Sequence, residues 1–371
     1  MLAVAALSAR AIVESAARDG MRCIAMDVFG DADTRHAAAR WVPIGDPAAL
    51  RIDGARLLAA LSQAREGGAT AWVAGSGFEG QPELLEAGAR QLPLWGTAGA
   101  DVARLRNPQT FFEFLHASGI AHPPVCLAPP RAPGRWLYKN SGACGGWHVC
   151  RSAEGPRGGG RHWQLERAGP AMSATFIGNG EDAVVLGFNL QLVRAIGGRP
   201  FVFAGVVGPV MPSDTTQRSI GDAVRKLAQA FRVRGLASLD FVLHDDRAEV
   251  IELNPRPPAS LALYPRVGAF GPLQAHRRAC LHDVLPSGPA PADIVRGIEI
   301  VFAPRALRLD AAAAESIAHW PRAHDLPRAG TAFRPGDPLC SLSASGADAS
   351  QVQAALTLGR DALLQSLETL A

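Results

Sequence analysis

The chain has 371 residues, with 37 basic and 34 acidic side chains and a formal net charge of only +3. This length is enough for two or three domains with cores of their own. The basic residues are scattered rather than gathered in a stripe, so nothing supports a nucleic-acid partner. No apolar run approaches the ~18 residues of a membrane span, so no membrane partner is expected. The six cysteines form no CxxC pair or zinc spacing, which is typical of free thiols in a reducing compartment and favours the cytoplasm.

The first part of the chain alternates between apolar strand-like runs and amphipathic helix-like runs. Strands are predicted at 2–7, 21–29, 41–45, 70–75 and 92–96, and helices at 9–19, 32–39, 54–65 and 81–90. Such alternation is typical of a parallel α/β unit. We therefore predict an N-terminal Rossmann-like domain over residues 1–96.

A glycine-rich segment within this unit, Gly75 to Gly80, fits the spacing GxGxxG and follows a strand. A dinucleotide fingerprint belongs at the first strand and is followed about 20 residues later by an acidic residue. This segment follows the fourth strand, and no such acidic residue caps a later strand. We therefore expect a turn that lines a cleft rather than a dinucleotide site.

A second glycine-rich segment begins near the middle of the chain. After a helix predicted over 97–118 and a proline-rich connection, the strand 135–139 ends at Lys139, and the loop Asn140 to Trp147 leads into a strand over 148–151. Only two of the 37 basic residues are lysines, the other being Lys226 in a predicted helix. An ammonium beside a loop with free backbone N–H groups is a layout that can hold phosphate. A hairpin with a flexible tip and no ligand is the alternative.

The rest of the chain predicts a largely antiparallel unit and a smaller C-terminal lobe. A mobile loop is expected at 152–162, strands at 163–167, 171–178, 182–194, 201–208, 296–304 and near 338–344, and helices at 216–233, 268–283 and 348–370. The central part divides into a connection (97–134), a lobe with the glycine-rich loop (135–200) and a lobe with a late hairpin (201–290), followed by the C-terminal lobe (291–371).

That late hairpin joins the segments SLDFVLHDD and RAEVIELNPRPP. It can bring Asp240 beside Glu252 and Asn254, which lie two residues apart and so point to one face of their strand. Two carboxylates and an amide oxygen suit a hard cation such as Mg²⁺. Asp and Asn are poor strand formers, so a purely solvated face explains them less well. Arg256, between two prolines, is available to contact an anion.

This order of elements resembles the ATP-grasp superfamily of ATP-dependent ligases. The motif D-x11-E-x-N-P-R and the lysine strand with its glycine loop carry the resemblance, which covers essentially the whole chain. It implies an α+β ATP-grasp fold, with an antiparallel ATP-binding core of two lobes and a small carboxylase-like C-terminal lobe. The chain looks most like amino-acid ligases of cofactor biosynthesis, such as the tyramine–glutamate ligase type of methanofuran synthesis.

The resemblance also implies roles for individual residues. Asp240, Glu252 and Asn254 are expected to hold Mg²⁺, or Mn²⁺ in its place, and Lys139 and Arg256 to act on the phosphates as catalytic residues. Contacts to ATP are expected from the loop and the hinge, through Lys139, Ser141, Gly142, Ala143, Gly145, Gly146, Gln164, Leu165, Glu166 and Arg167. Two family features are missing: Ala171 stands where a ribose-binding glutamate is usual, and Arg104 or Arg106 stands in for an upstream lysine.

Such a set of groups implies that ATP activates a carboxylate as an acyl phosphate, which an amine then attacks with release of ADP and phosphate. The expected substrates are an amino acid and an amine, and a homodimer is left open. A bicarbonate-activating carboxylase is the first alternative, since the C-terminal lobe fits it. A nucleotide-binding regulatory module without turnover is the second, because of Ala171. Substrate contacts are expected from Ser8, Arg10, Asp27 and 75–79, and from 256–264; Arg10 and Arg266 could receive a carboxylate or be surface cations.

Overall fold

The computed structural model describes residues 1–151, 160–245, 247–288 and 294–369. Its N-terminal sheet is built from β1 (Leu2–Ala5), β2 (Cys23–Asp27), β3 (Arg40–Pro43) and β6 (Ala71–Ala74), with α1 (Arg10–Arg18), α2 (Ala32–Ala37), α3 (Gly54–Glu66), α4 (Pro82–Gln91) and the short pair β4 (Gly45–Asp46) and β5 (Arg51–Ile52). The four strands are parallel, in the order β3-β2-β1-β6. Their near-continuous apolar sequence fits strands covered on both faces. The predicted parallel α/β unit is confirmed.

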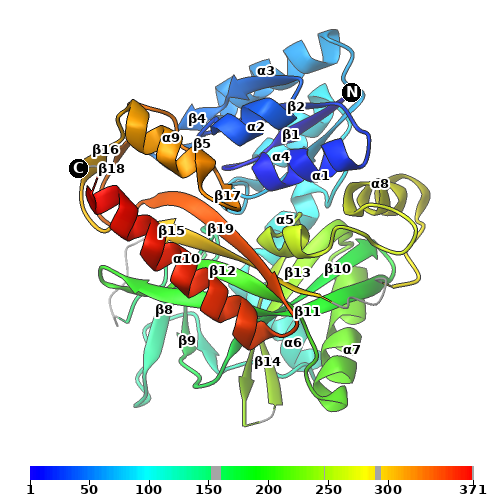
Figure 1. The fold of residues 1–371 in the computed structure, drawn as a ribbon. Coiled ribbons are helices and arrows are strands. Elements are labelled where there is room, and N and C mark those ends of the chain that lie inside the picture. Colours follow the sequence, from blue (N-terminus) through cyan, green and yellow to red (C-terminus); the bar gives the residue numbers. More distant parts are fainter. Residues whose placement is uncertain (152–159, 246, 289–293, 370–371) are drawn as a thin grey trace.

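The larger sheet lies beneath this unit in Figure 1. Its strands are β10 (Ala171–Asn179), β11 (Ala183–Ile196), β12 (Arg199–Val210), β13 (Arg234–His244), β14 (Arg247–Asn254), β15 (Val295–Phe302), β17 (Ala323–His324) and β19 (Pro338–Gly346). They are antiparallel, in the order β14-β13-β10-β11-β12-β15-β19-β17. The sheet therefore runs without a break from the late hairpin into the C-terminal strands.

A separate three-stranded sheet stands below the large one on the left of Figure 1. It consists of β7 (Val125–Cys126), β8 (Trp136–Asn140) and β9 (Arg161–Leu165), in the order β7-β9-β8. The remaining elements are α5 (Gly99–Leu105), α6 (Pro108–Ala117), α7 (Asp214–Ala230), the 3-10 helix η1 (Ala259–Leu263), α8 (Pro272–His282), α9 (Ala311–His319), α10 (Ala349–Thr369), β16 (Leu307–Arg308) and β18 (Ala332–Phe333).

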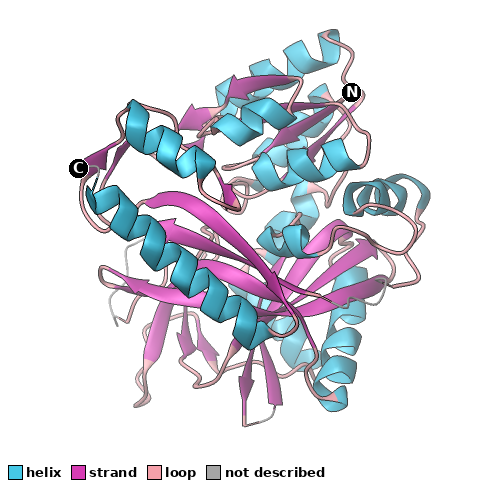
Figure 2. Ribbon diagram, viewed as in Figure 1, coloured by secondary structure: helices cyan, strands magenta, loops and turns pink. Residues whose placement is uncertain are grey.

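Helices cover the large sheet on both faces, as Figure 2 shows. The helix α7 buries one apolar side against the sheet, where Phe231 joins Phe111 of α6 in a single core. The helix α10 lies across β15 and β19, with Val352, Leu356 and Leu363 buried beneath it. Burial of apolar area is the main stabilising term in such layers, at about 25 cal/mol per Å².

The N-terminal unit shares a core with the large sheet. Side chains of α1, such as Ile12, pack in one cluster with Leu186 and Leu236 of the sheet and Leu273 of α8. This common core fixes the N-terminal unit over the sheet, and the space left between them forms the cleft described below.

The helix predicted over 97–118 is in fact two helices. The first ends at Leu105, and Asn107 caps the second, because its side chain accepts a hydrogen bond of 3.1 Å from the backbone N–H of Thr110. Pro108 occupies the first turn of α6, where its missing N–H costs nothing. The chain therefore turns at Asn107. The preceding residue, Arg106, is buried beside Glu252 and Asn254 of the late hairpin.

Three further predictions of secondary structure were wrong. The strands expected at 92–96 and 148–151 are single bridges, Leu94 to Trp72 and Cys150 to Tyr138, since proline and glycine bound the first and a turn from Gly146 interrupts the second. The helix α9 was not predicted, because prolines surround its alanine-rich sequence. Of the loop expected at 152–162, residues 152–159 lie outside the described residues, and 161–162 begin β9.

Among the parts of the chain that the structure describes, no helix is both long and apolar enough to cross a membrane.

Candidate active site

The late hairpin brings three oxygen-bearing side chains together, as the sequence predicts. Asp240 of β13 lies opposite Glu252 of β14, and Ser238 lies opposite Asn254. The amide of Asn254 donates a hydrogen bond of 3.2 Å to Asp240 Oδ2. The other oxygen, Asp240 Oδ1, is buried and accepts no hydrogen bond of ordinary geometry among the described residues, although the side chain of Gln191 lies close enough to act on the pKa of this carboxyl. A buried, unpartnered carboxylate oxygen is a position that a cation would complete.

The two carboxylates differ in their electrostatic surroundings. Burial, and then repulsion from Glu252, raises the pKa of Asp240 to about 7. Burial works in the same direction at Glu252, but attraction to the cationic groups around it, Arg106 first among them, outweighs burial and lowers the pKa of that carboxyl. The two carboxylates repel each other, and a cation between them would relieve that repulsion.

Lys139 reaches the same place from the neighbouring sheet. It lies near the end of β8, opposite His162 of β9, and its side chain lines the cleft. Burial lowers the pKa of the ammonium, while attraction to Glu252 and Asp240 works against that shift. The scarce lysine and the acidic hairpin therefore face each other, and an anionic ligand between them would meet both an ammonium and the metal-binding oxygens.

The glycine-rich loop packs against β12. The N–H groups of Ser141, Gly142 and Ala143 donate to Gly160 O, Asn140 Oδ1 and Asn140 O, respectively, and so close the base of the loop. Gly146 has a φ of +74°, and a Cβ there would lie 1.9 Å from the carbonyl oxygen of Phe201. Only glycine fits that position. Donors for a phosphate are therefore to be sought at Cys144 to Gly146, further along than Ser141.

The cleft between the N-terminal unit and the large sheet has a volume of about 1830 Å³. Its walls carry Lys139, the loop residues Gly142, Ala143, Gly145 and Gly146, the hairpin residues Asp240, Glu252 and Asn254, and Arg256. Ser76, Gly77 and Gly80 line it from the N-terminal unit, so the expectation of a cleft-lining turn there is confirmed. A Cβ on Gly80 would lie 2.4 Å from the carbonyl oxygen of Gly142, which shows how closely the turn and the loop approach.

The hinge segment from Gln164 to Arg167, which is expected to contact ATP, also lines the cleft. Gln164 is only 2% exposed, and its Nε2 has no partner among the described residues. Leu165, which follows it, also lines the cleft. Glu166 is paired with Arg151 and Arg135, and Arg167 is paired with Glu249 at 2.7 Å. Of these four side chains, Gln164 alone is both buried and short of a partner, so it is the best candidate for a base contact.

Two further residues join the site, and their contacts are not predictable from spacing. Glu79, from the turn after β6, accepts a hydrogen bond of 2.6 Å from Arg256 Nε and one of 2.7 Å from the N–H of Gly77. Arg106 donates to Glu252 Oε1 and, at 2.8 Å, to Asn254 Oδ1. Of the two arginines proposed to replace the upstream lysine, Arg106 is therefore in the site. Arg104 is half-exposed and pairs with Asp101.

Two expectations for the substrate side were wrong, and of the two interpretations of Arg266 the surface cation agrees with its exposed position. Asp27 does not line the cleft: it is fully buried and accepts hydrogen bonds from Ala9 N, Gly30 N and Trp41 Nε1. Tyr264 is buried as well, and its hydroxyl donates to Asn189 Oδ1. Arg266 is exposed and is not among the described residues that line the cleft.

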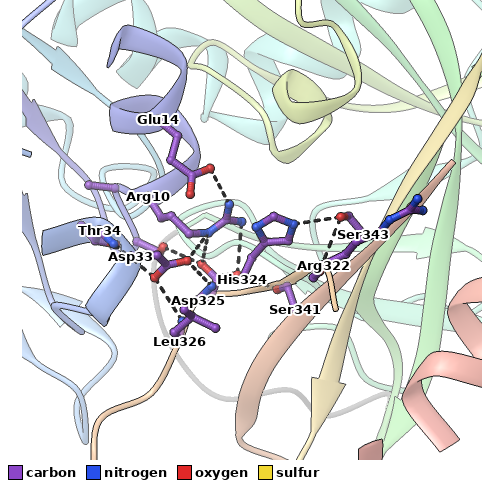
Figure 3. A network of polar contacts seen from close by, with 12 residues as sticks. Arg10, Glu14, Asp33, Thr34, Arg322, His324, Asp325, Leu326, Ser341 and Ser343 are labelled. Atoms are coloured by element: carbon purple, nitrogen blue, oxygen red, sulfur yellow. Dashed lines mark hydrogen bonds and ion pairs between the residues drawn. The ribbon is translucent and has the colours of Figure 1, made fainter. Parts of the chain in front are cut away.

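Arg10 is neither a surface cation nor a free carboxylate receptor. It is 4% exposed and pairs with Asp325 at 2.7 Å, with Glu14 at 3.0 Å and with Asp33 at 3.7 Å (Figure 3). Possible ligand atoms of Glu14, Asp33 and His324 lie within 4.8 Å of one another. The guanidinium already supplies the positive charge that a metal ion would bring to this cluster, so we assign it no metal.

Comparisons with known proteins agree with this geometry. Residues 107–260 match the family model of the ATP-grasp domain. An L-amino acid ligase from Bacillus licheniformis has a similar structure, with a TM-score of 0.71 at 17% identity over 97% of this chain and 96% of that one. The same holds for an N5-carboxyaminoimidazole synthetase from Staphylococcus aureus, with a TM-score of 0.69 at 12% identity over 97% of both chains.

A third structure, the biotin carboxylase domain of the 2-oxoglutarate carboxylase from Hydrogenobacter thermophilus, is a dimer in complex with MgADP, ADP and bicarbonate. It matches with a TM-score of 0.70 at 14% identity over 93% of this chain and 86% of that one. The predicted fold is confirmed by these matches and by the two sheets described above. Residues 107–260 therefore match an ATP-grasp domain, and the chain as a whole has the ATP-grasp fold.

Proposed function

We propose that the protein is an ATP-dependent ligase that activates a carboxylate as an acyl phosphate and couples it to an amine. The observation that carries this proposal is the meeting of Asp240, Glu252 and Asn254 with Lys139 in one cleft, under the glycine-rich loop. The orphaned Asp240 Oδ1 and the raised pKa of that residue support a cation at the hairpin. Mg²⁺ suits this set of oxygen ligands, and Mn²⁺ is its natural substitute.

In this mechanism a substrate carboxylate oxygen attacks the γ-phosphorus of ATP, and ADP leaves. An amine nitrogen then attacks the acyl carbon, phosphate leaves, and the amine loses a proton. When bound, the metal neutralises phosphate charge as it develops. Lys139 binds the phosphates, and Arg256, held by Glu79, supports the transferred phosphoryl group and the acyl phosphate from the substrate side. The buried wall around Gln164 orients the base, and the loop from Ser141 to Gly146 excludes water.

Amino-acid ligation in cofactor biosynthesis is the specific activity we propose, with glutamate and tyramine as the first substrates to test. Similarity to an L-amino acid ligase along nearly the whole chain supports this choice. Bicarbonate activation is the second candidate, because carboxylases share the fold and one such neighbour binds bicarbonate. A nucleotide-binding module without turnover is the third, because Ala171 offers no ribose contact. The homodimer and the cytoplasmic location stay predictions, as does the division at 96 and 290.

Release of ADP separates these candidates. Release that requires both an amino acid and an amine supports the ligase, release that requires bicarbonate supports the carboxylase, and tight ATP binding without turnover supports the module.

Two substitutions test the site itself. Lys139→Ala and Glu252→Gln should each abolish ADP release while circular dichroism shows an intact fold. Lys226→Ala is the matched control, because this second lysine is exposed and donates only to Ser118 O at 3.0 Å in the described chain. Near-normal ADP release by the Lys139→Ala or the Glu252→Gln variant would refute the assignment.

A further inference from the structure

Arg106 covers part of the proposed metal site. Its Nη1 donates to Glu252 Oε1 and its Nη2 to Asn254 Oδ1, so one guanidinium holds two of the three side chains expected to bind the metal. The residue is 7% exposed. Its backbone is tied to the glycine-rich loop, because Ser141 Oγ donates to Arg106 O at 2.6 Å. The arginine therefore sits where three parts of the site meet: the hairpin, the loop and the end of α5.

This arrangement is incomplete in two places. The Nε–H of Arg106 is buried without an acceptor among the described residues, and Asp240 Oδ1 is buried without a donor of ordinary geometry. A buried polar group without a partner destabilises the folded protein. The donor calls for an anionic oxygen and the acceptor for a cation, and a metal–nucleotide brings both. The unpaired donor of Arg106 and the unpaired acceptor of Asp240 therefore both fit a bound metal–nucleotide.

We propose that Arg106 is a stand-in cation, which holds Glu252 and Asn254 together until the metal–nucleotide takes over their oxygens and the guanidinium passes to a phosphate oxygen. This inference rests on the proposed nucleotide site. Arg106 is the last residue before the turn at Asn107, and its long side chain can change partners without a change in the backbone. A guanidinium and a divalent cation repel each other at contact distance, so they compete for these oxygens.

Competition and simple bracing predict opposite effects on metal binding. If Arg106 only braced the hairpin, its removal would disorder Glu252 and Asn254 and weaken the site. If Arg106 competes, removal frees both oxygens, and the empty site gains affinity for a bare divalent cation. The same removal weakens nucleotide binding in either case, so the binding of Mn²⁺ without nucleotide is the measurement that discriminates.

The test is titration of the full chain with Mn²⁺, followed by electron paramagnetic resonance, with and without ADP. Arg106→Gln should bind Mn²⁺ alone at least ~10-fold more tightly than the unmodified protein, and should bind Mn·ADP less tightly. Arg104→Gln is the matched control, because that arginine lies two residues away, is half-exposed and pairs with Asp101. It should leave both affinities unchanged. Unchanged or weakened Mn²⁺ affinity in a folded Arg106→Gln variant would overturn the inference.

A second measurement does not depend on the variant. In the unmodified protein, ADP should increase the affinity for Mn²⁺ at least ~10-fold, because displacement of Arg106 is favoured only when a phosphate can receive it. Tight Mn²⁺ binding that ADP does not improve would overturn the inference even if Arg106→Gln failed to fold. Failure of the unmodified protein to bind Mn·ADP at all would refute the proposed function, whereas normal Mn·ADP binding without competition would refute only the role of Arg106.

Discussion

Arg256 is held in place by Glu79, a residue of the N-terminal unit. Its Nε donates to Glu79 Oε1 at 2.6 Å, and its Nη2 lies 3.4 Å from Asn254 Oδ1. Burial opposes charge on Glu79, but the guanidiniums of Arg256 and Arg106 prevail and lower the pKa of that carboxyl. Glu79 therefore stays ionised and fixes the direction of Arg256 toward the cleft. We regard it as a positioning residue rather than a catalytic one.

Glu79→Gln should lower kcat for ADP release by ~10–100-fold, because a misplaced group costs about that much in rate. The Kd for ATP should stay within about threefold, since Lys139 and the loop are untouched. Measurement of kcat together with the Kd for a non-hydrolysed ATP analogue separates the two effects. Glu83→Gln, at an exposed position at the start of α4, is the control. Loss of nucleotide affinity in step with kcat would show that Glu79 acts on the nucleotide instead.

Only some residues of the candidate site can be identified from the sequence. Asp240, Glu252 and Asn254 can be recognised because poor strand formers recur at fixed spacing in one hairpin, and Lys139 because lysine is so scarce. The contacts of Glu79 and Arg106 join residues 177 and 146 positions apart. No local pattern encodes such a separation, and in a chain rich in arginine one more arginine carries no signal.

The position of the glycine-rich loop depends on the close approach of Gly146 to the backbone of Phe201. Gly146 lies against β12 with a positive φ, and any side chain there meets Phe201 O. Gly146→Ala should lift the loop from β12 and weaken ATP binding by at least ~10-fold, because the phosphate donors at Cys144 to Gly146 move with it. Isothermal titration with an ATP analogue measures this.

Gly198→Ala is the control for the loop, since a Cβ there meets no atom within 4 Å and its φ is not positive. Equal ATP affinity of the Gly146→Ala variant and the control would mean that the loop takes no part in binding.

A neutral histidine of α8, His276, links this helix to β13 and to Trp95. His276 Nδ1 accepts a hydrogen bond of 2.8 Å from Leu236 N, and Nε2 lies 3.0 Å from Trp95 O, to which it can donate. Burial lowers the pKa of His276 to about 4. Since the pKa in the unfolded chain is near 6.5, the unfolded state binds the proton first as the pH falls. The stabilisation is therefore complete above pH 6.5 and is lost between pH 6.5 and 4.

Replacement of this histidine should make the protein less sensitive to acid. Between pH 7 and pH 5 the unmodified protein should lose about 2 kcal/mol more unfolding free energy than His276→Gln loses. Urea denaturation at both values of pH gives this difference. His282→Gln, at the far end of the same helix, should behave like the unmodified protein. Parallel losses in the His276→Gln and unmodified proteins would show that His276 is not the group that titrates.

Elements were predictable where one local rule dominated. Alternation of apolar residues predicts β10 to β14, and the predicted helices of the N-terminal unit agree with α1 to α4 within a few residues. The failures lie where two rules compete. At Pro108 an uninterrupted helical pattern conceals a capped break, and in α9 the neighbouring prolines conceal a short helix.

Across the whole molecule, the first and last parts of the chain meet beside the cleft. Arg10 of α1 donates to Asp325, 315 positions later in the sequence, and Ser341 donates to the same carboxylate (Figure 3). Asp33 of α2 accepts the backbone N–H groups of Asp325 and Leu326 at 2.8 and 3.1 Å. The order of the strands explains the meeting, because β17 ends the large sheet beneath the N-terminal unit. Sequence patterns predict β15 and β19, but neither β17 nor the order of the strands.

Loss of the ion pair between Arg10 and Asp325 should lower the unfolding free energy more than loss of a surface ion pair does. Burial opposes charge on Asp325, but Arg10 outweighs it and lowers the pKa of that carboxyl, so both partners are charged. Arg10→Met should lower the unfolding free energy by about 3–5 kcal/mol, because three neighbouring carboxylates then lose the buried cation that they share. Asp325→Asn should cost less, because Arg10 keeps its contacts with Glu14 and Asp33. The double variant should lose clearly less than the sum, by at least about 1.5 kcal/mol.

The same double-mutant cycle on Arg225 and Asp222, which are 54% and 60% exposed, should give a coupling of at most about 0.5 kcal/mol. Urea denaturation of the seven proteins, with the unmodified protein common to both, measures the two cycles. Small-angle scattering should show a larger radius of gyration for Asp325→Asn, since the C-terminal lobe is then free to move from the N-terminal unit. A coupling between Arg10 and Asp325 no larger than the surface value would mean that the shared apolar core alone fixes the cleft.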